Sequence, residues 1–139
     1  MPFRNPALSN PKARVQSFTV TTLLPSTDPA TAGFYAGAFW TAPAKCVVDS
    51  VVARWEANSS SGTVTVHKVP SATAMDSGTA LLSSTISTAS GAATNSAGTL
   101  STTDATLELA SGDSLQLVDS GTLTSLTNLS VTVGLHWIS

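Results

Sequence analysis

The sequence predicts an all-β protein: an antiparallel β-sandwich, jelly-roll-like, with about eight strands and an extended N-terminal arm. Three observations lead to this class. Apolar and polar residues alternate with a period of two in most segments, as in sheets that bury one face. Turn-forming Gly, Pro, Asn, Asp and Ser separate these segments at short intervals. No segment shows the period of an amphipathic helix. A one-sheet barrel with other connectivity remains an alternative.

Residues 1–15 are expected to form the arm, and residues 16–139 a single β-sandwich domain. Pro2, Pro6 and Pro11 fix the backbone φ angle and remove hydrogen-bond donors, so this segment suits neither a helix nor a central strand. It contains three cations and no acid. One interpretation is an ordinary disordered terminus; the other is an arm that orders on a neighbouring subunit. In the second case its binding residues are Phe3, Arg4, Leu8, Lys12 and Arg14.

The first half of the domain contains four expected strands. Residues 16–24 are rich in Thr, Val and Phe, and residues 34–41 are rich in aromatic side chains and end before a proline. Residues 45–57 are long and β-branched. Residues 63–69 alternate valine with polar residues and end at Pro70.

The second half predicts four more strands. Residues 81–88 are expected to form one, followed by a long Ser/Ala/Gly/Asn loop over residues 89–99. The alternation of Leu107 and Leu109 indicates another, and a Ser-Gly-Asp turn leads into residues 115–117. The last strand lies within residues 128–138. Its core face has one parity and comprises Leu129, Val131, Val133, Leu135 and Trp137.

The strand at residues 45–57 contains a parity change. Its expected core residues are Cys46 and Val48 and then Val51, Ala53 and Trp55. Because the parity switches from even to odd at Asp49-Ser50, we expect a β-bulge at that step. The bulge would leave Arg54 and Glu56 in solvent.

The composition excludes several functions. The 139 residues include 21 Ser and 21 Thr, and only 10% are charged. All six basic residues lie within residues 1–68, and residues 69–139 contain five acids and no cation. Without a dense basic patch, nucleic-acid binding is disfavoured. So weakly charged a surface suits packing against copies of the same chain or a large partner.

The sequence predicts neither a membrane-spanning segment nor a secretory signal. No apolar run approaches the roughly 20 residues that cross a bilayer. The start of the chain has no apolar stretch of the secretory-signal type. A single cysteine, Cys46, cannot form an internal disulfide and suits synthesis in a reducing cytosol, where we expect it to be a buried strand residue.

No motif for catalysis, cofactor binding or metal binding occurs. The sequence lacks a nucleophile elbow, a P-loop and a dinucleotide-binding fingerprint. His67 and His136 belong to different expected strands, and a metal site would require them to converge or symmetry to gather copies. We therefore expect no enzyme, no cofactor and no metal.

The segment 34–40 is apolar on both faces. Phe34 and Trp40 share one parity, and Tyr35 and Phe39 share the other. One face can enter the core; the other must meet a neighbouring subunit, a stacked sugar or covering loops. Subunit contact is the interpretation we favour. Trp55 and Trp137 lie on apolar strand faces and are expected in the core. The candidate subunit-interface residues are Tyr35, Phe39 and Trp40.

The turn-and-strand pattern of residues 42–139 resembles that of small β-sandwich structural proteins of tailed bacteriophages, above all capsid decoration (cement) proteins and related head or tail spike modules. The segments that carry the resemblance are Ala42-Pro43-Ala44, Val51, Trp55, Gly62-Thr63-Val64-Thr65-Val66, Gly78-Thr79-Ala80-Leu81-Leu82 and Leu109-Ala110-Ser111-Gly112-Asp113-Ser114-Leu115-Gln116-Leu117. The stretch from Leu107 to Leu117 is also similar to trimeric jelly rolls of the tumour-necrosis-factor type.

The resemblance implies a non-enzymatic virion protein that binds across neighbouring major capsid subunits on the outer surface of the head. It implies a homo-oligomer, commonly a trimer, made in the cytoplasm of a bacterial host. It carries over no catalytic or ligand-binding residue. Two alternatives stay open: a carbohydrate- or receptor-binding module of a fibre or spike, in which Tyr35 or Trp40 stacks on a sugar, and a spacer domain of a tail or baseplate.

Overall fold

The computed structural model describes residues 16–23 and 37–138. The arm expected at residues 1–15 lies outside the described residues. The elements in chain order are β1 Ser17–Leu23, β2 Ala38–Thr41, β3 Cys46–Arg54, β4 Thr63–Val69, the 3₁₀ turn η2 Met75–Ser77, β5 Thr79–Ala80, β6 Ile86–Ser87, β7 Ser96–Ala97, the four-residue helix α2 Asp104–Leu107, β8 Glu108–Leu109, β9 Ser114–Ser120 and β10 Ser130–Trp137.

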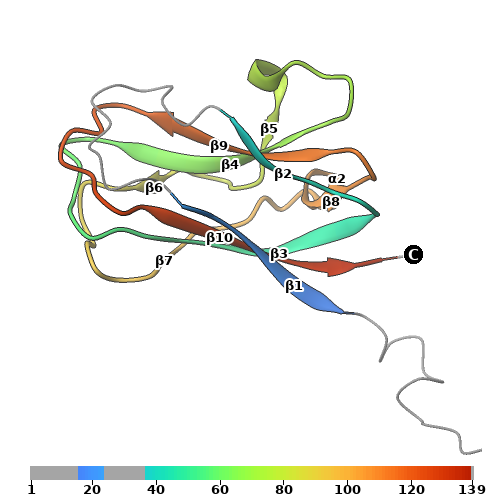
Figure 1. Ribbon diagram of the computed structural model, residues 1–139, viewed down its shortest axis with the longest axis horizontal. Helices are drawn as coiled ribbons and strands as arrows, with labels where there is room; N and C mark the ends of the chain where they lie inside the picture. Colours follow the sequence, from blue (N-terminus) through green and yellow to red (C-terminus); the bar gives the residue numbers. More distant parts are fainter. Residues whose placement is uncertain (1–15, 24–36, 139) are drawn as a thin grey trace, which may run out of the picture.

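The strands form two facing sheets (Figure 1). One has the order β1-β10-β3, with β7 and β8 both paired to β3. The other has the order β2-β9-β4, with β5 and β6 both paired to β4. All these pairings are antiparallel. When each pair of two-residue strands is taken as one interrupted strand, the sheets have four strands each, connected as in a jelly roll. The predicted fold class is confirmed.

The core lies between the sheets and is made by the inward side chains of alternating strand positions. Val131, Val133 and Leu135 of β10 are at most 1% exposed, as their common parity predicts. Trp137, at the end of the same strand, is half-buried and packs against the core from its margin. The alternation therefore identified the core face correctly, and burial decreases toward the end of the strand.

The expected bulge in β3 is confirmed. Gly134 of β10 pairs with Ser50 and the next residue, Leu135, pairs with Val48, so Asp49 is the extra residue. Cys46, Val48, Val51, Ala53 and Trp55 are all at most 2% exposed. Arg54 and Glu56 are exposed. The extra residue restores the inward direction of the side chains that follow.

Three expected elements between the long strands were wrong. Residues 81–88 do not form one strand: β5 precedes them, β6 occupies their end, and Leu82 makes an isolated bridge to Leu100. The expected loop at residues 89–99 contains β7. Leu107 ends α2 rather than belonging to a strand. These short elements exist because β3 and β4 supply partners for them, which local alternation does not reveal.

Candidate assembly surface

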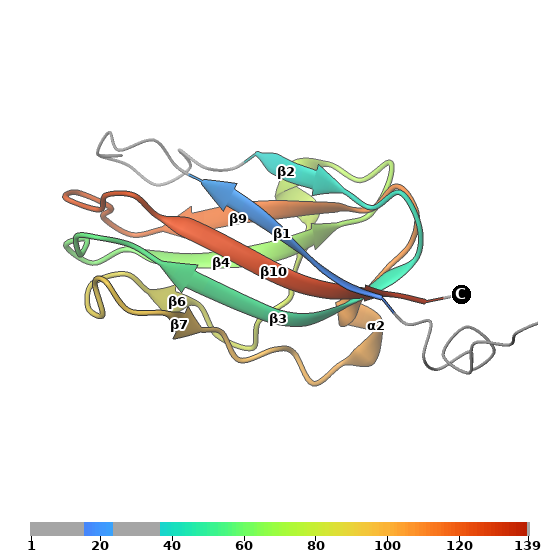
Figure 2. The ribbon, with the colours of Figure 1, turned by 60° about the horizontal axis from the view of Figure 1, so that its bottom comes forward.

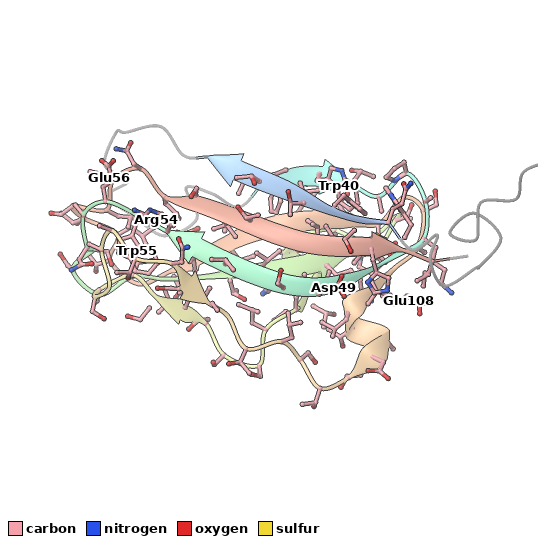
Figure 3. The ribbon with its side chains drawn as sticks, turned by 90° about the horizontal axis from the view of Figure 1, so that it is seen from below. Trp40, Asp49, Arg54, Trp55, Glu56 and Glu108 are labelled. Atoms are coloured by element: carbon pink, nitrogen blue, oxygen red, sulfur yellow. The ribbon has the colours of Figure 1, made fainter. Side chains whose placement is uncertain are left out.

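Three aromatic rings from three strands meet at one margin of the sandwich, between β1 of one sheet and β2 of the other. The Phe18 and Trp137 rings are stacked, with centroids 4.2 Å apart. The Trp40 ring is tilted to both, 5.7 Å from Phe18 and 6.5 Å from Trp137. All three are half-buried. Such offset and tilted contacts add about 0.5–1.5 kcal/mol per pair to the area that they bury. We call this trio the aromatic cluster; Figure 3 shows Trp40 near that margin.

A bulge in β2 explains why two consecutive aromatic residues both reach the core. Ala38 pairs with Gln116 and Trp40 pairs with Leu115, which leaves Phe39 as the extra residue. Phe39 and Trp40 both pack against the core, and both remain half-buried. Because of the bulge, apolar residues at both odd and even positions of this strand do not require that both faces of the strand be buried. Phe34 and Tyr35 lie outside the described residues.

The predicted arm would enter the fold beside the aromatic cluster. The Trp137 N–H donates to the Gln16 carbonyl over 3.1 Å, and the Ile138 N–H donates to the Lys45 carbonyl over 3.1 Å. The first described residue is thus tied to the strand that carries one of the three rings. The binding residues predicted in the arm, from Phe3 to Arg14, lie outside the described residues.

Two lysines of the basic first half of the sequence contact acceptors in the acidic second half. Lys45 and Glu108 form an exposed ion pair at 2.8 Å. The Lys68 ammonium donates to the carbonyls of Ala105 and Glu108, at 2.6 and 3.0 Å. Cations of the first half thus meet acceptors of the second half. Figure 3 shows Asp49 and Glu108 toward one end of the sandwich and Arg54, Trp55 and Glu56 toward the other.

An acid–histidine pair that the sequence did not predict lies on the outer face of the β1-β10-β3 sheet. His136 Nδ1 is 2.8 Å from both carboxylate oxygens of Asp49, the bulge residue. Beside it is an open hollow of about 470 Å³, lined by Ser17, Phe18, Thr19, Asp49, Ser50, Gly134 and Leu135. The parity change at Asp49 was the sequence signal that could have located this pair, because a bulge changes the direction of a side chain.

The described residues do not bring together a cluster that could hold a metal ion. His67 is on β4 and His136 on β10, in different sheets. No group of three or more His, Cys, Asp and Glu side chains gathers within the described ranges. The contact of the Asp49 carboxylate with the His136 imidazole joins β3 to β10.

Cys46 is a structural residue of the core. It is fully buried at the start of β3, as expected. Burial, and secondarily the charge of Asp113, raise the pKa of its thiol. Because the thiolate is the reactive form, the thiol stays protonated and inert in the folded protein.

His67 predicts a pH dependence of stability. It is half-buried on β4, where its register neighbours are Gln116 and Ala80, and burial lowers the pKa of its imidazole. The unfolded chain therefore takes up a proton near pH 6.5, before the folded chain does. The free energy of unfolding is therefore unaffected by this titration above that pH. It decreases as the pH falls toward the lower pKa of His67 in the folded protein.

His67→Gln should therefore flatten this fall. Urea unfolding at a series of pH values between about 7.5 and 5 measures the change in stability with pH. Because His136 is present in both proteins, any contribution from it is the same in the two. A wild-type protein and variant that lose stability in parallel would show that His67 is not the group responsible.

No protein-family model matches the sequence, and no curated protein matches it. Chains of solved structures match this structure to different degrees. A chain of the cyanophage Pam1 capsid asymmetric unit is 11% identical, with a TM-score of 0.50 over 90% of this chain and 86% of that chain. At this level of identity the likeness concerns the fold, and it agrees with the two-sheet architecture described above.

Two further similarities are weaker. A chain of the Bacillus endospore appendages, a family of disulfide-linked pili, is 12% identical, with a TM-score of 0.41 over 91% of this chain and 92% of that chain. A chain of infectious bursal disease virus, Gx strain, is 14% identical, with a TM-score of 0.38 over 89% of this chain and 32% of that chain. Within the described residues no helix has the length and apolar character to span a membrane.

Proposed function

We propose that this protein is a non-enzymatic structural component of a virion, and more specifically a decoration protein that binds across neighbouring major capsid subunits. The observation that carries the proposal is the half-buried aromatic cluster beside the point where the basic segment 1–15 joins the fold. The fold shared with a capsid chain of a cyanophage supports it. A domain with few charges and an apolar margin is stabilised when that margin is buried against other chains.

In this proposal the two parts of the chain have different tasks. Phe39 and Trp40, together with the predicted interface residue Tyr35, pack against other copies in a homo-oligomer, a trimer at a threefold position of the outer shell. Segment 1–15 extends over the shell, where Phe3 and Leu8 anchor it and its three cations meet acidic groups. Several modest contacts made at once add to a strong attachment. The protein would be made in the host cytoplasm and act on the virion.

Cosedimentation with shells of the parent virus that lack this protein tests the proposal. The full chain should pellet with the shells, and a variant lacking residues 1–15 should remain in the supernatant while keeping its circular dichroism spectrum and unfolding midpoint. A matched variant with Arg4, Lys12 and Arg14 changed to glutamine separates charge from length, because it should bind more weakly and lose its dependence on salt.

The outcomes distinguish the proposals. Full binding by the truncated variant would remove the arm from the mechanism, and absence of binding by the full chain would overturn the decoration role. The sugar-binding alternative predicts glycan binding that Trp40→Ala abolishes. The position of the Trp40 ring against Phe18 and Trp137 speaks against it, since part of the ring is already covered.

A further inference from the structure

Most outer edges of the two sheets are short or irregular. The β4 side of its sheet ends in β5 and β6, and the β3 side of the other ends in β7 and β8; each of these strands has two residues. The β2 edge has four residues and contains a bulge. Short and bulged edges are devices by which proteins prevent pairing with foreign strands.

The β1 edge has none of these devices. Ser17–Leu23 forms a seven-residue strand whose pairing with β10 continues without a shift in register. Its sequence, SFTVTTL, contains no charge, no proline and no glycine. Within residues 16–23 and 37–138, β10 is its only strand partner. Figure 2 shows β1 along the margin of its sheet.

The register identifies the backbone groups that point away from β10. The Trp137 N–H donates to the Gln16 carbonyl, so Gln16 and every second residue after it bond to β10. Correspondingly, the neighbouring Ile138 N–H donates to Lys45, on the β3 side. The N–H and C=O groups of Ser17, Thr19, Thr21 and Leu23 therefore point away from β10, to the edge of β1 that no other described strand pairs with.

We propose that this edge binds β1 of a second copy of the chain, antiparallel, about a twofold axis at Val20. That register pairs Thr19 with Thr21 and Ser17 with Leu23 in each direction, so all the outward-pointing groups find partners. It joins two five-stranded sheets into one continuous sheet. β1 is self-complementary in this register because each hydrogen-bonding position meets another.

The side chains fit the same register. Val20 lies opposite Val20 of the partner and Phe18 opposite a threonine, on the half-buried face at the open margin of the sandwich. The opposite face of β1 carries Ser17, Thr19 and Thr21, which are exposed. No like charges approach, since the strand has none, and aromatic with β-branched pairs favour sheet association.

The pairing is independent of the decoration role. If the chain is a trimer on the shell, β1 would connect copies that belong to neighbouring trimers; if it is not, β1 would join two chains. In both cases the pairing at least doubles the number of chains per particle in solution. The shell-binding experiment can fail while this pairing holds, and the reverse.

Disulfide crosslinking of two variants, each with one introduced cysteine, tests the register in the full-length chain. In the proposed pair Val20 faces itself at a non-hydrogen-bonded position with a Cα separation of about 4.5 Å, which suits a disulfide. Val20→Cys should therefore give several-fold more crosslinked dimer under mild oxidation than Thr21→Cys, although Thr21 is the more exposed residue. Cys46 is fully buried and does not compete. Equal yields, or more from Thr21→Cys, would overturn the register.

The particle mass provides a second measurement. Thr21→Pro removes an N–H that points away from β10, as edge strands tolerate, and keeps the backbone hydrogen bonds between β1 and β10. It also removes the hydrogen bond between the Thr21 and Thr132 hydroxyls, 3.0 Å apart, which Thr21→Val removes as well without blocking the edge and so serves as the control. Light scattering should show that this substitution lowers the mass of the wild-type particle at least two-fold, with an unchanged circular dichroism spectrum. An unchanged mass would refute the pairing. If the proline variant fails to fold, the crosslinking ratio decides the question.

Discussion

Replacing Trp55 by alanine is expected to lower the free energy of unfolding by about 3–5 kcal/mol. Trp55 is fully buried directly after β3. Its indole N–H donates to Asn58 Oδ1 over 3.0 Å, and its carbonyl accepts the Ala93 N–H over 2.7 Å. The Ala92 N–H donates to the same Asn58 oxygen. The side chain thus fills the core and fixes the connection from β3 to β4 against the loop before β7.

Urea unfolding followed by far-ultraviolet circular dichroism measures the loss. Trp55→Phe keeps an aromatic ring and removes the indole hydrogen bond, so its cost should be smaller, about 1–2 kcal/mol. Trp137→Ala provides a control of the same chemistry at a half-buried position and should also cost less. A Trp55→Ala variant that costs no more than Trp137→Ala would contradict this account of the core.

Gly62→Ala should be the second most damaging of the single changes considered, with a loss of about 1–3 kcal/mol from overpacking. A Cβ at Gly62 would collide with the Leu123 side chain and lie 2.9 Å from both Ser59 Oγ and Thr88 Oγ1. Those hydroxyls are buried and 2.7 Å apart, and the Gly62 N–H donates to Ser59. The methyl group must therefore displace a leucine or separate a buried hydrogen-bonded pair.

The chain offers a matched control for this change. A Cβ at Gly37 would have no atom within 4 Å, so Gly37→Ala should alter stability by no more than about 0.5 kcal/mol. The difference between the two unfolding midpoints isolates packing from the general effect of replacing glycine. Equal midpoints would mean that the segment around Gly62 relaxes without cost.

The site was predicted less completely than the fold. Trp40 and Phe39 were singled out as interface candidates from their parity, and the structure shows them half-buried, with Trp40 in contact with Phe18 and Trp137. Their role in subunit contact stays a prediction. No sequence feature linked Phe18 to Trp137, because the two residues are far apart in the chain and meet only through the pairing of β1 with β10.

Local alternation was sufficient wherever a long strand buries one face. It predicted β4 with its observed bounds, the core face of β10 and the bulge at Asp49, because a change of parity in a half-buried strand has few other solutions. The composition likewise fixed the low charge of the surface. These features depend on neighbours one or two residues away, which the sequence displays directly.

The tertiary structure alone decided which strands meet. Three features follow from partners that are distant in sequence: the two-residue strands β5 to β8, the hydrogen bond between His136 and Asp49, and the position of β1 at the edge of the described sheet. The physical reason is that hydrogen-bond pairing and ring contacts satisfy groups across sheets, and no local period encodes which distant group will be available. The alternation of apolar and polar residues predicts which face of a strand a side chain lies on. Only the tertiary structure determines which residues that side chain contacts.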